Sequence, residues 1–163
     1  MSAIASLRCA PMNARTRAAA AELLAAFLGD DAHYRDSAAS YGDGGRAALE
    51  RALDLFLAHP RTGFVWLGST EAGEAVGACV VCYAISTSRG ARVAKLDDVT
   101  IRAGWQGRGV GTALLEALCD RLRGEGVARI DTACHRDNEG AWRFYERLGF
   151  RPLHEERLAL LLP

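Results

Sequence analysis

Residues 96–115 read LDDVTIRAGWQGRGVGTALL, a stretch in which the pattern changes from that of a strand to that of a helix. The part before position 102 predicts a strand, and the leucines from position 114 onward recur at helical spacing. The glycines between them permit positive φ and let a ligand approach the backbone closely. Because a helix start offers unpaired N–H groups and partial positive charge, this order of elements predicts a site for an anion such as phosphate. The absence of acids between positions 102 and 115 agrees with this interpretation.

Two common phosphate-binding motifs do not fit these glycines. A P-loop ends in Gly-Lys-Ser/Thr, whereas Gly111 is followed by Thr112 and Ala113. A dinucleotide-binding motif requires G-x-G-x-x-G, which has a wider last gap than the GRGVG at residues 107–111. A tight turn that serves only the packing of the helix is the remaining alternative.

The rest of the chain extends the pattern into one mixed α/β (α+β) domain over residues 1–163. Strands are expected at residues 4–9, 64–67, 77–84, 93–101 and 127–134, with one or two more in residues 150–163. Helices are expected at residues 13–28, 46–59, 111–123 and 138–148, and residues 71–74 predict a hairpin turn. Residues 29–45 form a polar segment with no expected helix or strand.

Composition excludes several classes of protein. The 163 residues carry 20 Lys and Arg against 20 Asp and Glu, with a mean hydropathy of −0.01. This balance argues against a broad basic face for nucleic acid. No apolar run approaches the ~20 residues that span a bilayer, and the first residues lack the basic and apolar regions of a signal peptide. We therefore expect a cytoplasmic protein with neither a nucleic acid nor a membrane as partner.

The five cysteines are an odd number in a chain long enough to form its own core. That count favours a reducing compartment over a disulfide framework. Cys79 and Cys82 form a C-x-x-C motif inside an apolar run, but residues three apart on a strand point to opposite faces. We therefore expect no metal site at this pair.

Two motifs resemble those of a known family. The sequence QGRGVG at residues 106–111 matches R/Q-x-x-G-x-G/A, the pyrophosphate loop of the GNAT superfamily of N-acetyltransferases. NEGAWRFYERLGF at residues 138–150 is similar to that family's later N-x-x-A-x-x-F-Y-x-x-x-G-F motif. The resemblance implies a GNAT-like domain, with a mixed and mostly antiparallel central sheet of about six to seven strands flanked by about four helices.

A narrower resemblance lies upstream. YAIST at residues 83–87 and LDDVTI at residues 96–101 are similar to stretches of the polyamine (diamine) acetyltransferase branch. Asp97 stands where that branch has Glu, and Val99 and Thr100 replace a bulkier, usually aromatic pair.

The resemblance implies acetyl-CoA as co-substrate and direct transfer of its acetyl group to an amine, without a covalent acyl-enzyme. Gln106 and the backbone N–H groups that follow it would bind the pyrophosphate. The pantetheine arm would pair with the backbone of residues 99–101 and with Asn138, which can also cap its helix. The implied cofactor-binding residues are Val99, Thr100, Ile101, Gln106, Gly107, Arg108, Gly109, Val110, Gly111, Thr112, Asn138, Ala141 and Tyr145.

Acetyl transfer requires a base for the amine proton and an acid for the departing thiolate. Tyr145 matches the family's general acid, although its place on the apolar stripe of its helix also fits a core aromatic. Asp97 matches the proposed base of the polyamine branch, and Asp98 is the second candidate. Neighbouring residues on a strand face opposite ways, so both acids can reach one substrate atom only if a bulge intervenes.

The resemblance places the acceptor entrance at residues 29–45, where four Asp and one Arg give a charge of −3 that would attract a cationic amine. The expected acceptor-binding residues are His33, Tyr34, Tyr83 and Asp97. The predicted function is therefore N-acetylation of a small cationic amine, such as a polyamine or a lysine-like compound. Acetylation of a protein N-terminus or lysine, and a non-catalytic CoA-binding or sensing module, are the alternatives. A homodimer through the apolar residues 158–162 is a further hypothesis.

Overall fold

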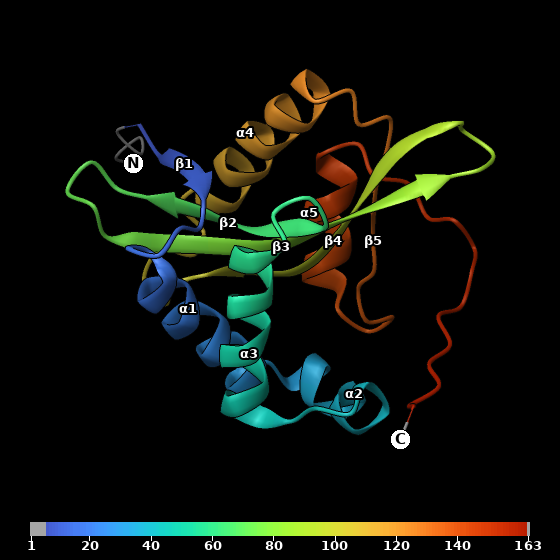
Figure 1. The fold of residues 1–163 in the computed structure, drawn as a ribbon, viewed down its shortest axis with the longest axis horizontal. Coiled ribbons are helices and arrows are strands. Elements are labelled where there is room, and N and C mark those ends of the chain that lie inside the picture. Colours follow the sequence, from blue (N-terminus) through green and yellow to red (C-terminus); the bar gives the residue numbers. More distant parts are fainter. Residues whose placement is uncertain (1–5, 163) are drawn as a thin grey trace.

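The computed structural model describes residues 6–162 and contains one five-stranded sheet with helices on both faces (Figure 1). The strands lie side by side in chain order. The first four are antiparallel, and β5 runs parallel to β4 after a crossover through α4. The strands are β1 (Arg8–Pro11), β2 (Gly63–Ser69), β3 (Ala75–Ser86), β4 (Ala91–Ile101) and β5 (Ile130–Thr132). The helices are α1 (Arg17–Asp30), α2 (Ala32–Tyr41), α3 (Gly45–Ala58), α4 (Val110–Gly124) and α5 (Glu139–Arg147).

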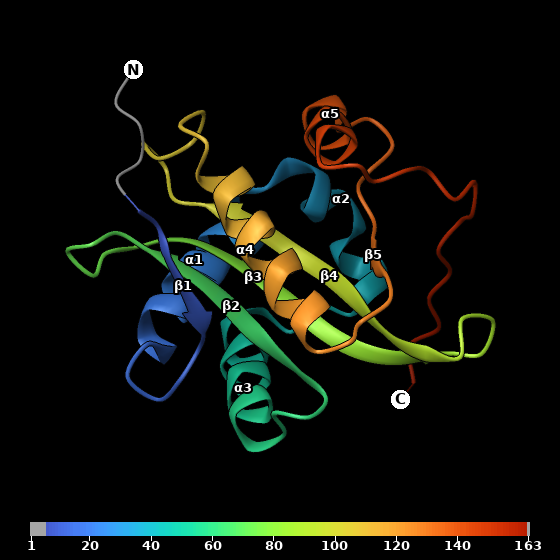
Figure 2. The same ribbon diagram turned by 90° about the horizontal axis from the view of Figure 1, so that it is seen from above.

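Strand β2 explains why the sheet is covered on both sides. Phe64 and Trp66 pack in one core cluster with the leucines of α4, whereas Val65 and Leu67 pack in another with α1 and α3. Because successive strand residues point to opposite faces, a continuous run of buried apolar residues requires a layer on each side. Figure 1 shows α4 above the strands and α1 and α3 below them, and Figure 2 shows α4 lying across the sheet.

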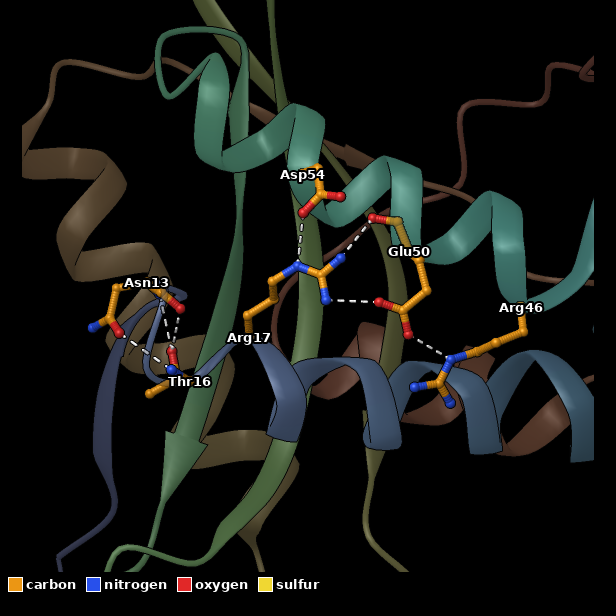
Figure 3. A network of polar contacts seen from close by, with 6 residues as sticks. All are labelled: Asn13, Thr16, Arg17, Arg46, Glu50 and Asp54. Atoms are coloured by element: carbon orange, nitrogen blue, oxygen red, sulfur yellow. Dashed lines mark hydrogen bonds and ion pairs between the residues drawn. The ribbon is translucent and has the colours of Figure 1, made fainter.

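Helices α1 and α3 are joined by a polar network around Arg17 (Figure 3). Its Nε donates to Asp54 Oδ1 at 2.8 Å, and its two terminal nitrogens donate to the carboxylate and the backbone carbonyl of Glu50 at 2.7 and 3.0 Å. Arg46 donates to the other oxygen of the Glu50 carboxylate at 2.7 Å. The network holds α1 against α3.

Helix α2 corrects the expectation that residues 29–45 contain no helix. The Asp31 side chain caps its start by accepting a hydrogen bond from the Tyr34 backbone N–H at 2.7 Å, and Gly42 ends it with a φ of +66°. None of its residues is buried. The apolar periodicity by which a helix is found in a sequence is therefore missing, and only the two caps mark it.

The residues after α5 correct a second expectation. No strand forms in residues 150–162, so the sheet of the described chain has five strands rather than six to seven, and its helices number five rather than about four. Residues 151–162 make no hydrogen bond between backbone groups within the described part of the chain. Figure 1 shows them as an extended red segment on the outside of the molecule. We call residues 151–162 the C-terminal segment.

The other elements lie close to their predicted places, and the predicted class of fold is confirmed. The first strand begins at Arg8 rather than at residue 4, and residues 4 and 5 lie outside the described part of the chain. Strand β5 is shorter than the predicted residues 127–134. Across residues 6–162, no helix is both long enough and apolar enough to cross a membrane.

Candidate active site

Strand β4 contains a bulge at its two acids. Its pairing with β3 shifts between Ala78 and Val80, so that two residues of β4 lie opposite one residue of β3. Asp98 lies in this interval and has a left-handed φ of +52°. The alternation of side chains is therefore interrupted, which is the condition under which Asp97 and Asp98 can lie on the same side of a strand.

The two acids have different surroundings. Asp97 forms ion pairs with Lys95 Nζ at 2.9 Å and with the guanidinium of Arg157 at 3.8 Å. Asp98 is mostly removed from solvent, and this burial, together with the charge of Asp97, raises its pKa from 3.8 to about 6. A carboxyl with a pKa close to neutral can both accept and release a proton at physiological pH. Of the two acids, Asp98 has the properties of a general base.

Tyr145 projects from α5 into the core cluster on the α4 side of the sheet. Its ring meets Phe144 and Phe150 edge-on, with 5.3 Å between ring centroids in each pair. Burial raises its pKa to about 12, and the charge of Asp97 adds to the shift. The hydroxyl therefore stays protonated at neutral pH and is close enough to the β4 bulge to respond to its charge. Both expectations for Tyr145, a core aromatic and a proton donor, are compatible with this position.

The end of β4 is open on its β5 side. Strand β5 pairs only with residues Ala94, Lys95 and Leu96, so that the backbone groups of residues 97–101 have no β5 partner in the described chain. Asn138 lies beyond β5, where its side chain accepts a hydrogen bond from the Ala141 N–H at 3.0 Å and caps α5. An extended ligand that needs backbone hydrogen bonds would find them along this edge.

A glycine-rich turn connects the open end of β4 to α4. Gly104, Gly107 and Gly109 have φ values of +83°, +70° and +82°, and a Cβ at any of them would have no neighbour within 4 Å. Helix α4 begins with no side-chain cap and no acid in its first turn. Its N–H groups are thus available to an anion, as the sequence predicts.

Two side chains of this turn were predicted to bind the cofactor. Gln106 donates from Nε2 to the carbonyl of Ile101 at 3.3 Å, which folds the turn back on the end of β4. The Arg108 guanidinium lies 5.4 Å from the ring centre of Trp105. Gly111 faces α5, since a Cβ there would lie 3.2 Å from the Phe144 ring. The turn, α4 and α5 are therefore packed closely around the start of α4.

Helix α2 brings two of the predicted acceptor residues to the site. Tyr34 lies close enough to Asp98 for that charge to affect its pKa, which burial and a hydrogen bond to Asp43 raise to about 12. Its ring stacks on Tyr41, with 6.1 Å between centroids. His33 meets His135, from the loop after β5, with 5.2 Å between ring centroids. Residues from segments far apart in the sequence thus gather beside β4.

Tyr83 lies elsewhere. Its hydroxyl donates a short hydrogen bond to Glu125 at the end of α4, and Arg92 covers its ring at 4.6 Å. It also packs against Phe64 in the core cluster on the α4 side. The structure therefore brings Tyr83 together with residues that join the sheet to α4, and not with His33 or Tyr34.

Two cations that lie beside Asp97 are not among the site residues that the sequence predicts. Lys95 is the single lysine among 20 Lys and Arg, which is the only signal the sequence offers for it. Arg157 comes from the C-terminal segment and lies far from Asp97 in the chain, so no local pattern indicates that they meet. Residues 6–162 contain no group of three or more His, Cys, Asp or Glu side chains suited to holding a metal ion.

The chain is similar to known proteins both in sequence and in fold. The family profile described as Acetyltransferase (GNAT) family matches residues 30–150. A curated relative, glucosamine 6-phosphate N-acetyltransferase of Trypanosoma brucei brucei, is 33% identical over 89 residues. That match covers 54% of this chain, and it spans little more than half, 58%, of the relative's length.

Solved structures share the fold. An acetyltransferase from Trypanosoma brucei aligns with a TM-score of 0.68 and 23% identity, covering 96% of this chain and 100% of the other. Glucosamine-6-phosphate N-acetyltransferase from Arabidopsis thaliana aligns with a TM-score of 0.69 and 13% identity, covering 96% of this chain and 99% of the other. At these identities the likeness establishes the arrangement of helices and strands.

Proposed function

The chain belongs to the GNAT family of acetyltransferases, and we propose that it transfers the acetyl group of acetyl-CoA to the primary amine of a small molecule. The observation that carries this proposal is the half-buried carboxyl of Asp98 in the β4 bulge, next to an open strand edge and a glycine turn. These features would supply a base, a free strand edge for an extended arm and a cradle for a diphosphate within one end of the sheet. The narrower assignment to the polyamine branch stays a prediction.

Acetyl-CoA fits the groups available on the chain. Backbone N–H groups from Gly107 to Thr112 would receive the pyrophosphate, helped by the partial positive charge at the start of α4. The free backbone of residues 97–101 would pair with the pantetheine arm, and Asn138 and Ala141 would border that arm at the start of α5. Arg108, held over Trp105, supplies a cation for the phosphates.

The chemistry needs two proton transfers. Asp98 accepts the proton of the acceptor amine, directly or through a water, because its raised pKa leaves it with proton affinity near neutrality. Tyr145 donates its proton to the departing thiolate, for which it must be protonated beforehand, as its high pKa ensures. Asp97 holds Lys95 and Arg157 and keeps the charge around Asp98 in place. Asp98 therefore replaces Asp97 as our first choice for the base.

The test is an assay of thiol release from acetyl-CoA with a panel of small amines and peptides, combined with mass spectrometry of the products. We expect an acetylated small amine as product, and loss of turnover in Asp98→Asn and Tyr145→Phe with retained CoA binding. Transfer to peptides alone would favour the protein-acetyltransferase alternative. Tight CoA binding without transfer to any member of the panel would favour the remaining alternative, a non-catalytic CoA-binding or sensing module.

We also propose a homodimer through the end of the C-terminal segment. Leu158 is 96% exposed, and Leu160 and Leu162 are each 84% exposed. Exposed apolar runs of this kind are commonly covered by a partner. Sedimentation of the wild type and of Leu160→Glu tests this: a dimer that the substitution dissociates is expected, and a wild-type monomer at high concentration would refute it.

A further inference from the structure

We infer that the acceptor carries an anionic group, a carboxylate or a phosphate, in addition to its amine, and that Arg157 with Lys95 binds this group. The inference deepens the proposed function and rests on it. It differs from the cationic acceptor that the sequence favours, because it depends on two cations that only the folded chain places beside the acids.

The C-terminal segment is held so that Arg157 faces the site. Glu156 forms an ion pair with Arg136 in the loop after β5. Leu161 packs on the turn that ends α2, since a Cβ at Gly42 would lie 2.9 Å from its Cδ2. Between these contacts, the Arg157 guanidinium lies 5.9 Å from the ring centre of Tyr41 and 3.8 Å from Asp97 Oδ1. A segment without backbone hydrogen bonds is thus fixed by side chains on both sides of one arginine.

Asp97 and Asp98 match the charges of Lys95 and Arg157, but Arg157 is only loosely paired. The Asp97 carboxylate is engaged by Lys95 at 2.9 Å, and Arg157 approaches the other oxygen at the wider distance of 3.8 Å. At 3.8 Å the Arg157 guanidinium is beyond hydrogen-bond distance of Asp97, so this acid uses none of its N–H donors. Both side chains are 47% exposed, whereas Asp97 is 28% exposed, so a dissolved anion can reach the cations more readily than a cation can reach the acid.

The other acids of the C-terminal segment and of the turn after α2 interact with other groups. Glu156 forms an ion pair with Arg136, and the charge of Glu155 acts on Arg129. On α2 and its following turn, the Asp43 carboxylate accepts hydrogen bonds from the Tyr34 hydroxyl at 3.1 Å and from the Gly45 N–H at 2.6 Å. An anion on the acceptor would complete the pairing of Arg157, whose planar guanidinium suits both carboxylate and phosphate.

The acceptor site is accordingly bipolar. Asp98 is the group that receives the proton of the amine, and Lys95 and Arg157, which pair with the neighbouring Asp97, are the cations. A polycation would place charge against both cations and would be disfavoured. A molecule with an amine and an anion would be oriented by two contacts of opposite sign, which positions the amine for reaction.

The experiment compares pairs of acceptors that differ in the anion: glucosamine 6-phosphate with glucosamine, and β-alanine with β-alaninamide. Putrescine represents the cationic acceptors. Rates of thiol release are measured for the wild type, Arg157→Gln, Arg157→Lys and the control Arg151→Gln, which removes an exposed arginine from the same segment. Which pair responds distinguishes a phosphate from a carboxylate.

For the wild type we expect kcat/KM at least about tenfold higher for the anionic member of one pair, because one charge-assisted hydrogen bond is worth that much. Arg157→Gln should raise KM for that member about tenfold more than for its uncharged partner, and Arg157→Lys should restore part of the loss. Arg151→Gln should behave as the wild type. A wild-type preference for putrescine or for the uncharged members, or an equal effect of Arg157→Gln on both members, would overturn the inference.

Calorimetric titration of the same pairs into the CoA-loaded protein separates this inference from the proposed function. If no amine is acetylated, the proposed function fails. Tighter binding of the anionic member, lost in Arg157→Gln, would still support an anion site at Arg157. Equal binding of both members would refute that site whether or not transfer occurs.

Discussion

At the scale of single residues, Asp98 combines burial, a left-handed backbone and a neighbouring like charge, and each has a measurable consequence. Replacement by Asn removes the base while keeping the shape, and kcat/KM should fall roughly 10²- to 10⁴-fold. Because the base must be ionised, wild-type activity should decline as the pH falls below its pKa of about 6. The residual activity of Asp98→Asn should lack this decline. A wild-type profile that is flat between pH 5 and 7 would remove Asp98 from this role.

The same carboxyl also lowers stability above its pKa. Its pKa is higher in the folded state than the ordinary 3.8, so its contribution favours the folded state at low pH and is lost as the pH rises through about 6. Asp98→Asn should therefore be more stable than the wild type at pH 8, by about 2 kcal/mol, and should lose most of this advantage at pH 4. Urea unfolding at the two pH values measures the difference. An advantage of equal size at both would show that the acid is not responsible.

Tyr145 allows a comparison at nearly constant packing. Tyr145→Phe keeps the ring between Phe144 and Phe150 and removes the hydroxyl that we assign to the thiolate. We expect kcat to fall roughly 10²-fold or more, with an unchanged dissociation constant for CoA. Because the pKa of about 12 keeps the hydroxyl protonated, the ratio of wild-type to variant rates should be constant from pH 6 to 9. Full activity of the variant would make Tyr145 a core residue only.

At the scale of elements, the role of the glycine turn before α4 can be tested by comparing it with the turn at Gly73, where the glycine has a similar φ. Gly109 and Gly73 have φ values of +82° and +88°, and a Cβ at either would meet nothing within 4 Å. Alanine at each should cost about 1–2 kcal/mol through backbone strain alone. Only Gly109→Ala should also weaken CoA binding, by about tenfold or more, because its turn forms the predicted cradle. Equal CoA affinity in the two variants, measured by calorimetry, would contradict a phosphate site at this turn.

The elements also show which parts of the fold a sequence can reveal. Helices α1, α3, α4 and α5 bury an apolar face or carry a motif, and the pattern identifies each of them. Helix α2 buries nothing, so only its caps distinguish it from a loop. The apolar residues 158–162 suggest a strand, but within residues 6–162 they pair with no strand and make no hydrogen bond between backbone groups.

The residues of the candidate site also fall into those that the sequence can predict and those that only the fold brings together. The residues of the glycine turn, Asn138 and Tyr145 are predictable because their spacing along the chain is itself the signal. The bulge at Asp98 depends on how β3 and β4 align, and the meeting of Arg157 with Asp97 depends on the path of the C-terminal segment. Neither leaves a local pattern. The sequence therefore indicates the proposed cofactor end of the site better than the proposed acceptor end.

At the scale of the whole molecule, the core and the acceptor specificity are expected to be separable. Both core clusters are built from residues up to Phe150, and the C-terminal segment adds exposed side chains and ion pairs at the surface. Surface ion pairs contribute about 0–1 kcal/mol each. A chain that ends at Phe150 should therefore fold cooperatively, with a Tm within about 5 °C of the full chain, and should bind CoA with unchanged affinity.

The shortened chain should nevertheless lose its choice of acceptor. Without Arg157, Lys95 and Asp97 neutralise each other, and anionic and uncharged amines should react with similar kcat/KM, as in Arg157→Gln. Three measurements on one preparation test this: Tm from thermal unfolding, CoA affinity from titration, and kcat/KM for the paired acceptors. Loss of cooperative unfolding would assign the C-terminal segment to the core. A shortened chain that still prefers the anionic acceptor would instead place the anion contact on Lys95 alone.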